Sequence, residues 1–372
     1  MTPKAGCTPL TLADYETLAR SRMPAMAHAY FSAGAGEELG LAANLAQWRG
    51  WRLLPQVLNG RAAGGGTNIR LFGADLAHPF IVAPMALQRL AHSEGEAAVA
   101  LAAAAQGGVM TVATESSVTI EDMARTSPGP LWFQLYPRHA FAQSLDLLRR
   151  AEGAGCSAIV VTVDAPLTPP RPREIRAGFH LPDGIAPVHL SQMAPPVFAA
   201  LEDGESPVFD RLLTIAPDWD DIAKLRAATR LPLILKGILN PADAKRAVAC
   251  GADGIVVSNH GGRLLDSLPT ALEMLPVVAD AVAGAVPLIV DGGVRRGEDA
   301  LIARALGADA VMVGRPVLHG LAVAGARGAS HVLRILRDEL EVAMALLGLR
   351  TLADVSTDML RQAPLMPNEP GM

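Results

Sequence analysis

The stretch CGADGIVVSNHGGRLLD, residues 250–266, carries the features that indicate the fold class. A helix-like segment ends at a glycine and is followed by the apolar run GIVV, which then ends in polar side chains that include Ser258, His260 and Arg263. An apolar run without alternation is typical of a parallel strand covered on both faces. A buried strand that ends in so many polar groups predicts a site at its carboxyl end.

Similar runs, rich in Val and Ile, recur along the chain. They are PFIVAPM (79–85), GVMTVAT (108–114), LWFQLY (131–136), SAIVVTVD (157–164), PLILKGI (232–238), GIVVSNH (254–260), PLIVDGG (287–293) and AVMVGRP (310–316). Helical segments lie between most of them, and the helix-Gly-strand joint recurs in AGCSAIVV and LGADAVMV. Eight strand-helix units predict an α/β fold, a (β/α)8 TIM barrel. The alternative is a doubly wound sheet, which is disfavoured because no strand opens into a G-x-G-x-x-G turn.

The chain is interpreted as one barrel domain over residues 1–372, with two additions. Residues 1–60 look helical and are expected to form an N-terminal helical cap. Residues 180–216, which follow the fourth strand, are rich in Pro and Gly and are too long for an ordinary strand-helix loop. We expect this segment to be a lid-like loop or a partner surface.

Composition and charge narrow the function classes. A net charge of -5 without any run of five basic residues argues against a nucleic-acid or membrane partner and favours small-molecule chemistry. Cys7, Cys156 and Cys250 are interpreted as reduced core residues, and no metal site is expected. The N-terminal segment MTPKAGCTPL lacks the apolar stretch of a signal peptide, so we expect a cytoplasmic enzyme.

Polar residues follow most of the predicted strands. Any one of them would more often be structural, but the carboxyl ends of barrel strands converge on one mouth, so together they predict a single site. The set with its flanking residues comprises Met85, Thr114, Gln134, Tyr136, Thr162, Asp164, Lys236, Ser258, His260, Arg263, Asp291, Arg295, Gly314 and Arg315. DGGVRRG and GRP leave the last two strands, where glycine amides and arginines commonly bind phosphate, so a phosphate monoester is expected.

These motifs also carry a family resemblance. LKG, SNHGGRLLD, DGGVRRG and GRP, with FQLY, TVD and AYFSAGA, resemble the FMN-dependent (S)-2-hydroxy acid oxidase and dehydrogenase family, which includes glycolate-, lactate- and mandelate-oxidising enzymes. TVATESSVTIEDMA and APMALQRL look most similar to 4-hydroxymandelate oxidase. The resemblance covers almost the whole chain. It implies FMN as cofactor, a 2-hydroxy acid as substrate and a homotetramer.

The resemblance also implies catalytic roles. His260 would be the base that takes a proton from the substrate, and Asp164 would stabilise its protonated form. Lys236 would stabilise the negative charge that gathers on the flavin on reduction. A carboxylate beside an imidazole agrees with the first role because it raises the basicity of the ring and fixes its orientation.

Substrate and cofactor positions follow in the same way. Arg171 and Arg263 would hold the substrate carboxylate, assisted by Tyr30 and Tyr136, and Met85 would line the substrate pocket. Arginine suits this role because its planar fork meets a carboxylate with two hydrogen bonds. The residues implied to contact FMN are Ala83, Pro84, Met85, Ala86, Gln134, Thr162, Lys236, Ser258, Asp291, Gly292, Gly293, Arg295, Gly314 and Arg315.

Some positions depart from the glycolate-oxidising pattern. Met85 replaces a small polar residue, Ala113 a serine and Glu115 a tryptophan, which predicts space for a bulky or aromatic (S)-2-hydroxy acid of the mandelate type. This prediction assumes that the Glu115 carboxylate turns outward or finds a hydrogen-bond partner. By resemblance, the small Ala86 favours dioxygen as the acceptor, giving hydrogen peroxide. The alternatives are a dehydrogenase of the same family that uses a quinone or another carrier, and a barrel that binds a phosphorylated ligand without oxidation.

Overall fold

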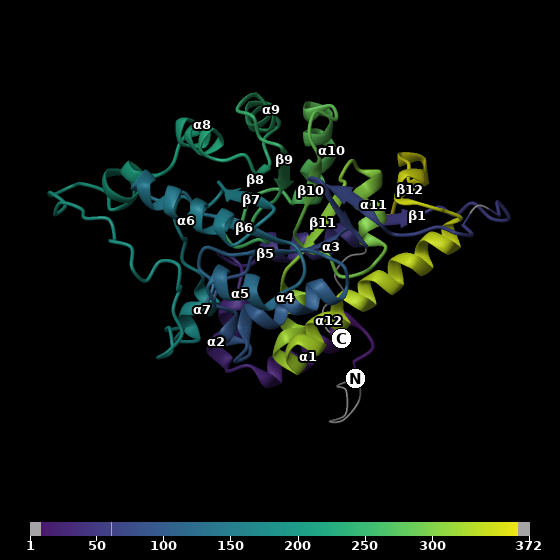
Figure 1. The fold of residues 1–372 in the computed structure, drawn as a ribbon, viewed down its shortest axis with the longest axis horizontal. Coiled ribbons are helices and arrows are strands. Elements are labelled where there is room, and N and C mark those ends of the chain that lie inside the picture. Colours follow the sequence, from purple (N-terminus) through teal and green to yellow (C-terminus); the bar gives the residue numbers. More distant parts are fainter. Residues whose placement is uncertain (1–8, 61, 364–372) are drawn as a thin grey trace.

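The apolar runs form the strands of a closed parallel barrel (Figure 1). The structure is a computed structural model, and it describes residues 9–60 and 62–363. The barrel strands are β4 (Phe80–Val82), β5 (Met110–Val112), β6 (Leu131–Leu135), β7 (Ala158–Thr162), β8 (Leu233–Ile238), β9 (Gly254–Val257), β10 (Leu288–Val290) and β11 (Ala310–Val313). Each neighbour is the next strand in sequence, and the barrel closes where Val311 of β11 pairs with Phe80 of β4. The predicted (β/α)8 barrel is confirmed.

Helices follow the strands and surround the barrel. They are α4 (Gly95–Ala105), α5 (Ile120–Thr126), α6 (Phe141–Gly153), α8 (Trp219–Ala228), α9 (Pro241–Ala249), α10 (Ala271–Val282), α11 (Asp299–Ala305) and α12 (Arg315–Leu347). Several begin at residues that favour helix N-termini. Asp218 is the N-cap of α8 and forms a capping box, and Asn240 is the N-cap of α9 and precedes a proline. Non-helical backbone at Ala324 and Gly325 divides α12 into two parts.

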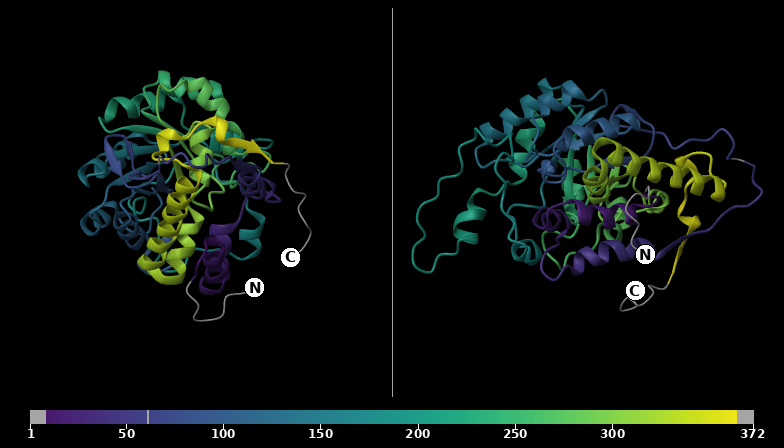
Figure 2. Two further views of the ribbon diagram at one scale, coloured as in Figure 1. Left: turned by 90° about the vertical axis from the view of Figure 1, so that its right-hand side faces the viewer. Right: turned by 90° about the horizontal axis from the view of Figure 1, so that it is seen from below.

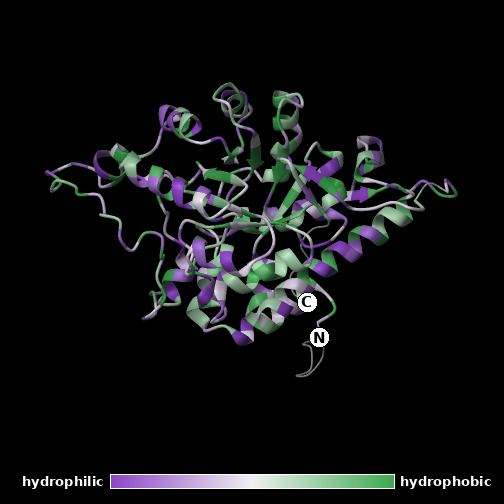
Figure 3. Ribbon diagram, in the orientation of Figure 1, coloured by the Kyte–Doolittle hydropathy of each residue, from purple (hydrophilic) through white to green (hydrophobic). Residues whose placement is uncertain are grey.

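The unbroken apolarity of the strands is explained by two packed layers. Side chains such as Trp132, Val160 and Val256 fill the barrel interior, whereas their neighbours Phe133 and Val161 pack in the layer that includes the helices. Both faces of the strands are therefore buried. Figure 3 shows the matching hydrophobic colour of the ribbon at the centre of the molecule.

A hairpin that the sequence analysis did not anticipate closes the amino-terminal end of the barrel. It consists of β2 (Ile69–Leu71) and β3 (Ala74–Leu76), and Leu71 and Leu76 join the interior cluster. At its turn Phe72 has a positive φ of 48° and packs edge-on against Trp132, with ring centroids 5.4 Å apart.

The predicted N-terminal cap is helical over only part of its range. It contains α1 (Leu12–Arg22), α2 (Ala25–Ser32) and α3 (Leu39–Arg49), followed by the strand β1 (Trp51–Leu53), which pairs antiparallel with β12 (Leu360–Gln362). The prediction of helix up to residue 60 is therefore wrong. Residues 1–8, with Cys7, lie outside the described residues.

The cap lies at the carboxyl-terminal mouth of the barrel. The Ala35 amide donates to the Gly262 carbonyl at 2.9 Å, and the Gly40 amide donates to Asp266 Oδ1 at 2.8 Å. Both acceptors belong to the loop after β9, so the three helices are tied to the end of the barrel where the polar residues gather.

The segment 180–216 carries little regular structure. It follows β7 and the short helix α7 (Pro172–Arg176), and its only helical turns are the π-helical η2 (Val208–Leu212) and the 3-10 turn η3 (Leu213–Ile215). Figure 2 shows it reaching well away from the barrel. Short 3-10 turns also occur at η1 (Gln88–Leu90), η4 (Leu352–Asp354) and η5 (Thr357–Met359). A lid role and a single-domain organisation stay predictions.

Cys156 is buried and Cys250 half-buried, and both are free thiols. No helix within residues 9–60 and 62–363 is long and apolar enough to cross a membrane.

Candidate active site

A cavity of about 640 Å3 opens at the barrel mouth. Most of the predicted site residues line it: Tyr30, Ala83, Pro84, Met85, Ala86, Gln134, Tyr136, Thr162, Arg171, Lys236, His260, Arg263, Asp291, Gly292, Gly293, Arg295, Gly314 and Arg315. Asp164 and Ser258 lie behind it, bonded to His260 and Lys236. The structure thus brings the predicted set together, in a cavity of a size suited to a cofactor and a small substrate.

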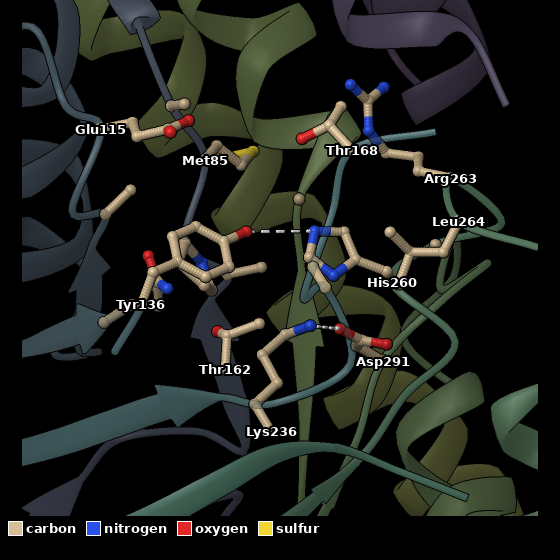
Figure 4. Close-up of a pocket in the computed structure, with 18 of the residues that line it drawn as sticks. Met85, Glu115, Tyr136, Thr162, Thr168, Lys236, His260, Arg263, Leu264 and Asp291 are labelled. Atoms are coloured by element: carbon tan, nitrogen blue, oxygen red, sulfur yellow. Dashed lines mark hydrogen bonds and ion pairs between the residues drawn. The ribbon is translucent and has the colours of Figure 1, made fainter. Parts of the chain in front are cut away.

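His260 presents one ring nitrogen to the cavity. Its Nδ1 lies 2.9 Å from Asp164 Oδ1, and its Nε2 lies 3.4 Å from the Tyr136 hydroxyl (Figure 4). Because a carboxylate accepts the Nδ1 proton, Nε2 carries the lone pair that faces the cavity. The backbone of His260 has a positive φ of 56°, a conformation that few residues other than glycine adopt and that often occurs at functional positions.

Asp164 is suited to remain ionised. Burial by itself raises its pKa, but the charge and hydrogen bond of His260, together with the Lys236 ammonium, outweigh burial and lower the pKa below its usual value. An ionised Asp164 can stabilise a positive charge on His260. The pair is therefore built for proton transfer at Nε2.

Lys236 is a buried cation at the floor of the cavity. Its Nζ lies 3.0 Å from Asp291 Oδ2 and donates to Ser258 Oγ at 2.9 Å. Burial lowers the pKa of the ammonium, but Asp291 and Asp164 together raise it above its usual value. Lys236 therefore stays charged and can stabilise negative charge on a ligand beside it.

Arg263 is aimed by the end of α2. Its Nη1 donates to the carbonyls of Tyr30 at 2.9 Å, Phe31 at 3.2 Å and Ala33 at 2.9 Å. Burial lowers the pKa of the guanidinium to about 10, so it is still charged at neutral pH. These bonds all use Nη1, and Nε and Nη2 have no hydrogen-bond partner in the described part of the chain. The guanidinium also lies over the Tyr30 ring, 5.7 Å from its centroid.

Two aromatic hydroxyls stand beside this arginine. Burial raises the pKa of Tyr30 to about 12, and it raises the pKa of Tyr136 further, so both are neutral donors at physiological pH. The Tyr30 ring also stacks on Phe179, with centroids 4.5 Å apart. Arg263, Tyr30 and Tyr136 all line the cavity and offer it several hydrogen-bond donors, which suits a carboxylate.

Arg171 has an acidic partner that the sequence analysis missed. Its Nε and Nη2 donate to the two carboxylate oxygens of Glu174, at 2.5 and 3.2 Å, and both side chains are largely buried. Arg171 faces the cavity, but a substrate carboxylate would have to share it with Glu174. The signal for this pair is their i,i+3 spacing across Pro172, at the start of α7.

Glu115 corrects an assumption made from the sequence. It lines the cavity (Figure 4). Its carboxylate has no hydrogen-bond partner among the residues that the structure describes. The expectation that it turns outward or finds such a partner is therefore wrong. Burial raises its pKa, although the charges of Arg138 and Arg171 oppose that shift. Its backbone is held toward the cavity by the Leu87 amide, which donates to the Glu115 carbonyl at 3.0 Å.

The far end of the cavity is suited to an anion. Gly292 and Gly293 have positive φ values of 87° and 86°, and a Cβ at Gly293 would lie 2.0 Å from the Asn44 carbonyl oxygen. Burial, and then the nearby Arg263 and Arg295, lower the pKa of Arg315 to about 9, which leaves it charged. Clustered buried cations of this kind favour a negatively charged ligand.

Several buried polar atoms have no partner within residues 9–60 and 62–363. Those on cavity-lining side chains include Gln134 Nε2, Thr162 Oγ1, Asp291 Oδ1 and Arg315 Nη2. Buried polar groups are almost always hydrogen-bonded, so unpaired ones along one cavity indicate a ligand that supplies their partners. These unpaired atoms include donors, such as Gln134 Nε2 and Arg315 Nη2, and an acceptor, Asp291 Oδ1. No group of three or more His, Cys, Asp or Glu side chains in the described ranges is placed to hold a metal ion.

Comparisons with known proteins agree with this geometry. A profile of the FMN-dependent dehydrogenase family matches residues 19–362. An L-lactate oxidase of Roseobacter sp. (strain GAI101) is 50% identical over 352 residues, which are 95% of each chain. A 4-hydroxymandelate oxidase of Amycolatopsis orientalis is 44% identical, covering 92% of this chain and 95% of that one. A crystal structure of mandelate oxidase with (S)-2-phenylpropionate matches with a TM-score of 0.86 at 42% identity, covering 96% of this chain and 99% of that one.

Proposed function

The chain belongs to the FMN-dependent dehydrogenase family, as a 2-hydroxy acid oxidase, and we propose that it oxidises a short aliphatic (S)-2-hydroxy acid of the lactate type to the 2-oxo acid. The observation that carries this proposal is the cavity-facing Nε2 of His260, backed by Asp164 and set beside the carboxylate-binding wall of Arg263. Oxidation of a 2-hydroxy acid requires a base that removes a proton and a cation that binds the carboxylate. His260 and Arg263 supply these two groups.

FMN fits the residues that surround the cavity. The arginines Arg295 and Arg315 and the glycine pair at 292–293 would hold its phosphate, whereas the unpaired atoms of Gln134 and Thr162 would bond its ring. When bound, FMN would supply the two-electron acceptor for the hydroxy acid, with dioxygen as the final acceptor and hydrogen peroxide as the second product. Lys236 would stabilise negative charge at the ring, since it remains an ammonium ion inside the cavity.

The protein residues position the substrate and move its proton. Arg263 would bind the substrate carboxylate through its unused Nε and Nη2, and Tyr30 and Tyr136 would add neutral donors. His260 Nε2 takes a proton from the substrate, and Asp164 stabilises the imidazolium that results. Loss of two electrons and two protons converts the hydroxy acid into the 2-oxo acid.

A lactate-type substrate is supported by two observations. The Roseobacter relative, half of whose aligned residues are identical to this chain, is an L-lactate oxidase. In addition, the unpaired Glu115 carboxylate in the cavity wall would be desolvated by a phenyl ring without receiving a hydrogen bond, which is costly. A short side chain leaves room for water at this carboxylate.

An aromatic substrate of the mandelate type is the second candidate. The match to mandelate oxidase at a TM-score of 0.86 favours it, as do Met85 and Ala113, because both line the cavity and neither blocks it with a ring. Burying a phenyl ring against apolar wall could add roughly 2 kcal/mol relative to a bare methylene group. Which substrate is preferred therefore depends on whether the free energy gained by burying the phenyl ring exceeds the free energy lost by desolvating the Glu115 carboxylate.

A substrate comparison tests the proposal. The purified flavoprotein is mixed with L-lactate, (S)-mandelate and glycolate, and flavin bleaching without air and peroxide release in air are followed. The highest kcat/KM with L-lactate supports the proposal, and the highest with (S)-mandelate overturns it in favour of the second candidate. If the substrate bleaches the flavin but air restores its colour only over many minutes, the protein is a dehydrogenase and not an oxidase.

The predicted homotetramer and cytoplasmic location are part of this proposal. The tetramer rests on the family resemblance of the sequence motifs, and light scattering of the purified holoenzyme is its direct measurement.

A further inference from the structure

The loop that carries Glu115 is fixed on its barrel side. Thr114 Oγ1 donates to the Gln134 carbonyl at 2.7 Å and accepts from the Tyr136 amide at 3.1 Å. The Thr114 amide donates to Gln134 Oε1 at 3.1 Å. These bonds tie the loop after β5 to the end of β6, immediately before Glu115.

The same loop is fixed on its outer side by His189, from the segment 180–216. His189 is only 2% exposed; its Nε2 accepts from the Ile120 amide at 2.9 Å, so its Nδ1 carries the proton and donates to the Thr114 carbonyl at 3.1 Å. The Val188 amide adds a bond to the Ser116 carbonyl at 3.0 Å. Glu115 is thus held between two anchored neighbours, and its place in the cavity wall is preorganised.

The carboxylate of Glu115 is available to a ligand. Arg138 and Arg171 are near enough to oppose the effect of burial on its pKa, yet neither forms an ion pair with it in the described structure. Arg171 is instead engaged by Glu174. Glu115 is half-buried and faces the cavity, where water can hydrate its carboxylate. A substrate that displaces this water without bringing a donor leaves the carboxylate desolvated and unpaired, which costs free energy, whereas a substrate that brings a donor avoids that cost.

The position of Glu115 selects the part of the substrate that it can meet. Figure 4 shows Glu115 and Arg263 on opposite sides of the cavity, with Met85 between them. A substrate whose carboxylate is held at Arg263 and whose hydroxyl faces His260 would direct its side chain away from both. The side chain is then the part of the substrate that can approach Glu115.

Resting on the proposed function, we propose that Glu115 is a specificity residue that reads a hydrogen-bond donor on the substrate side chain. Among (S)-2-hydroxy acids longer than lactate, the enzyme accepts those that end in a hydroxyl or another donor and discriminates against their alkyl equivalents. When the bound substrate covers a polar group of the site, the analogue that leaves this group unpaired is rejected more strongly than an apolar pocket rejects a missing methyl group.

Two substrates of the same shape test this. (S)-2,4-Dihydroxybutyrate and (S)-2-hydroxypentanoate differ only by a terminal hydroxyl in place of a methyl group. For the wild-type holoenzyme, kcat/KM is expected to be about tenfold or more higher for the dihydroxy acid, since hydrogen bonds to charged groups are the strong ones. Glu115→Leu should abolish or invert the ratio, and Glu115→Gln should keep part of it. Glu273→Gln, which removes an exposed carboxylate on α10, is the matched control and should keep the wild-type ratio.

The possible outcomes separate the two proposals. A wild-type ratio near or below one overturns the role of Glu115, and so does an unchanged ratio in Glu115→Leu. If Glu115→Leu does not retain flavin, the test rests on the ratio of kcat/KM values for the two acids, measured in the wild type and in Glu115→Gln. If neither L-lactate nor either test acid reduces the flavin of the wild-type protein, the proposed function itself fails.

Discussion

Asp164 and His260 pair across an intervening strand. The carboxylate follows β7 and the imidazole follows β9, so the 2.9 Å contact passes over the end of β8. Gly237 of β8 makes this possible, because a Cβ there would lie 2.4 Å from Asp164 Cγ. The glycine of the LKG motif is therefore part of the geometry that places the base.

Removing the base or its partner should separate chemistry from cofactor binding. His260→Ala is expected to retain flavin and to lose reduction by substrate by several orders of magnitude, because general-base assistance and alignment disappear together. Asp164→Asn keeps an acceptor for Nδ1 but no charge, and should slow reduction by about 100-fold. Rapid-mixing measurements without air give both rates. Near-normal reduction in His260→Ala would assign the base to another residue.

Gly237→Ala should reproduce the effect of losing Asp164. The added methyl group meets the carboxylate, and the positive φ of 108° adds backbone strain, so the Asp164–His260 pair is forced apart. Flavin reduction is expected to slow by about 100-fold, comparable to Asp164→Asn. Gly153→Ala is the control, since nothing lies within 4 Å of a Cβ at that position. Equal rates in the two alanine variants would show that the contact at Gly237 does not matter.

Arg263→Lys should affect acids more than esters. The variant keeps the positive charge and loses the planar fork, so it is expected to cost on the order of 2–4 kcal/mol in kcat/KM for a hydroxy acid. The methyl ester of the same substrate lacks the carboxylate and should lose much of this difference. Steady-state assays with both compounds measure it. A loss of the same size for acid and ester would mean that Arg263 does not bind the carboxylate.

Arg315→Met should weaken cofactor retention. The guanidinium is buried, and its Nη2 has no partner within the described chain, so the phosphate would lose a charged donor. We expect the FMN dissociation constant to rise by about 100-fold, the effect of removing one buried charged hydrogen bond. Flavin fluorescence in the filtrate after ultrafiltration reports the free cofactor. Arg230→Met, at an exposed arginine, is the control and should bind FMN like the wild type.

His78 should make the fold sensitive to acid at a place far from the cavity. Burial lowers its pKa from 6.5 to about 4, so the unfolded chain takes up a proton between these values while the folded protein does not. The contribution of neutral His78 to stability is therefore complete above pH 6.5 and falls as the pH is lowered, by about 2 kcal/mol at pH 5.

His78→Asn should flatten this dependence. Asparagine cannot titrate but can still accept the bond that Nδ1 receives from the Phe80 amide at 3.2 Å. Melting temperatures of wild type and variant at pH 8 and pH 5 are the measurement. If both lose the same number of degrees between the two values, His78 is not the responsible group.

The barrel could be predicted because its signal is local and repeated. Each strand is an unbroken apolar run whose two faces are both buried, and each polar ending falls at the same end of the barrel. The strand order alone therefore predicts that residues such as Lys236 and His260 meet in one cavity, and no other long-range information is needed.

The additions to the barrel could not be predicted because their signals are short or distant. The strands of the β2–β3 hairpin and of the β1–β12 pair have three residues each, too few to show a period. The orientation of Glu115 depends on His189, more than 70 positions along the chain. Arg171 was predicted to bind only the substrate, because a glutamate three residues away usually indicates an exposed charge. In the structure Glu174 is instead largely buried in an ion pair with Arg171.

The attachment of α2 has a consequence for how activity is lost. Arg263 and Arg315 donate to the last carbonyls of this helix, where the helix dipole is negative, so the cap and the two arginines form one cooperative unit. A transient detachment of the first helices would release both guanidinium groups while the closed barrel stayed intact. Local opening of the cap, visible as fast amide hydrogen exchange at residues 30–35, is then an inactivating event that needs no unfolding of the barrel.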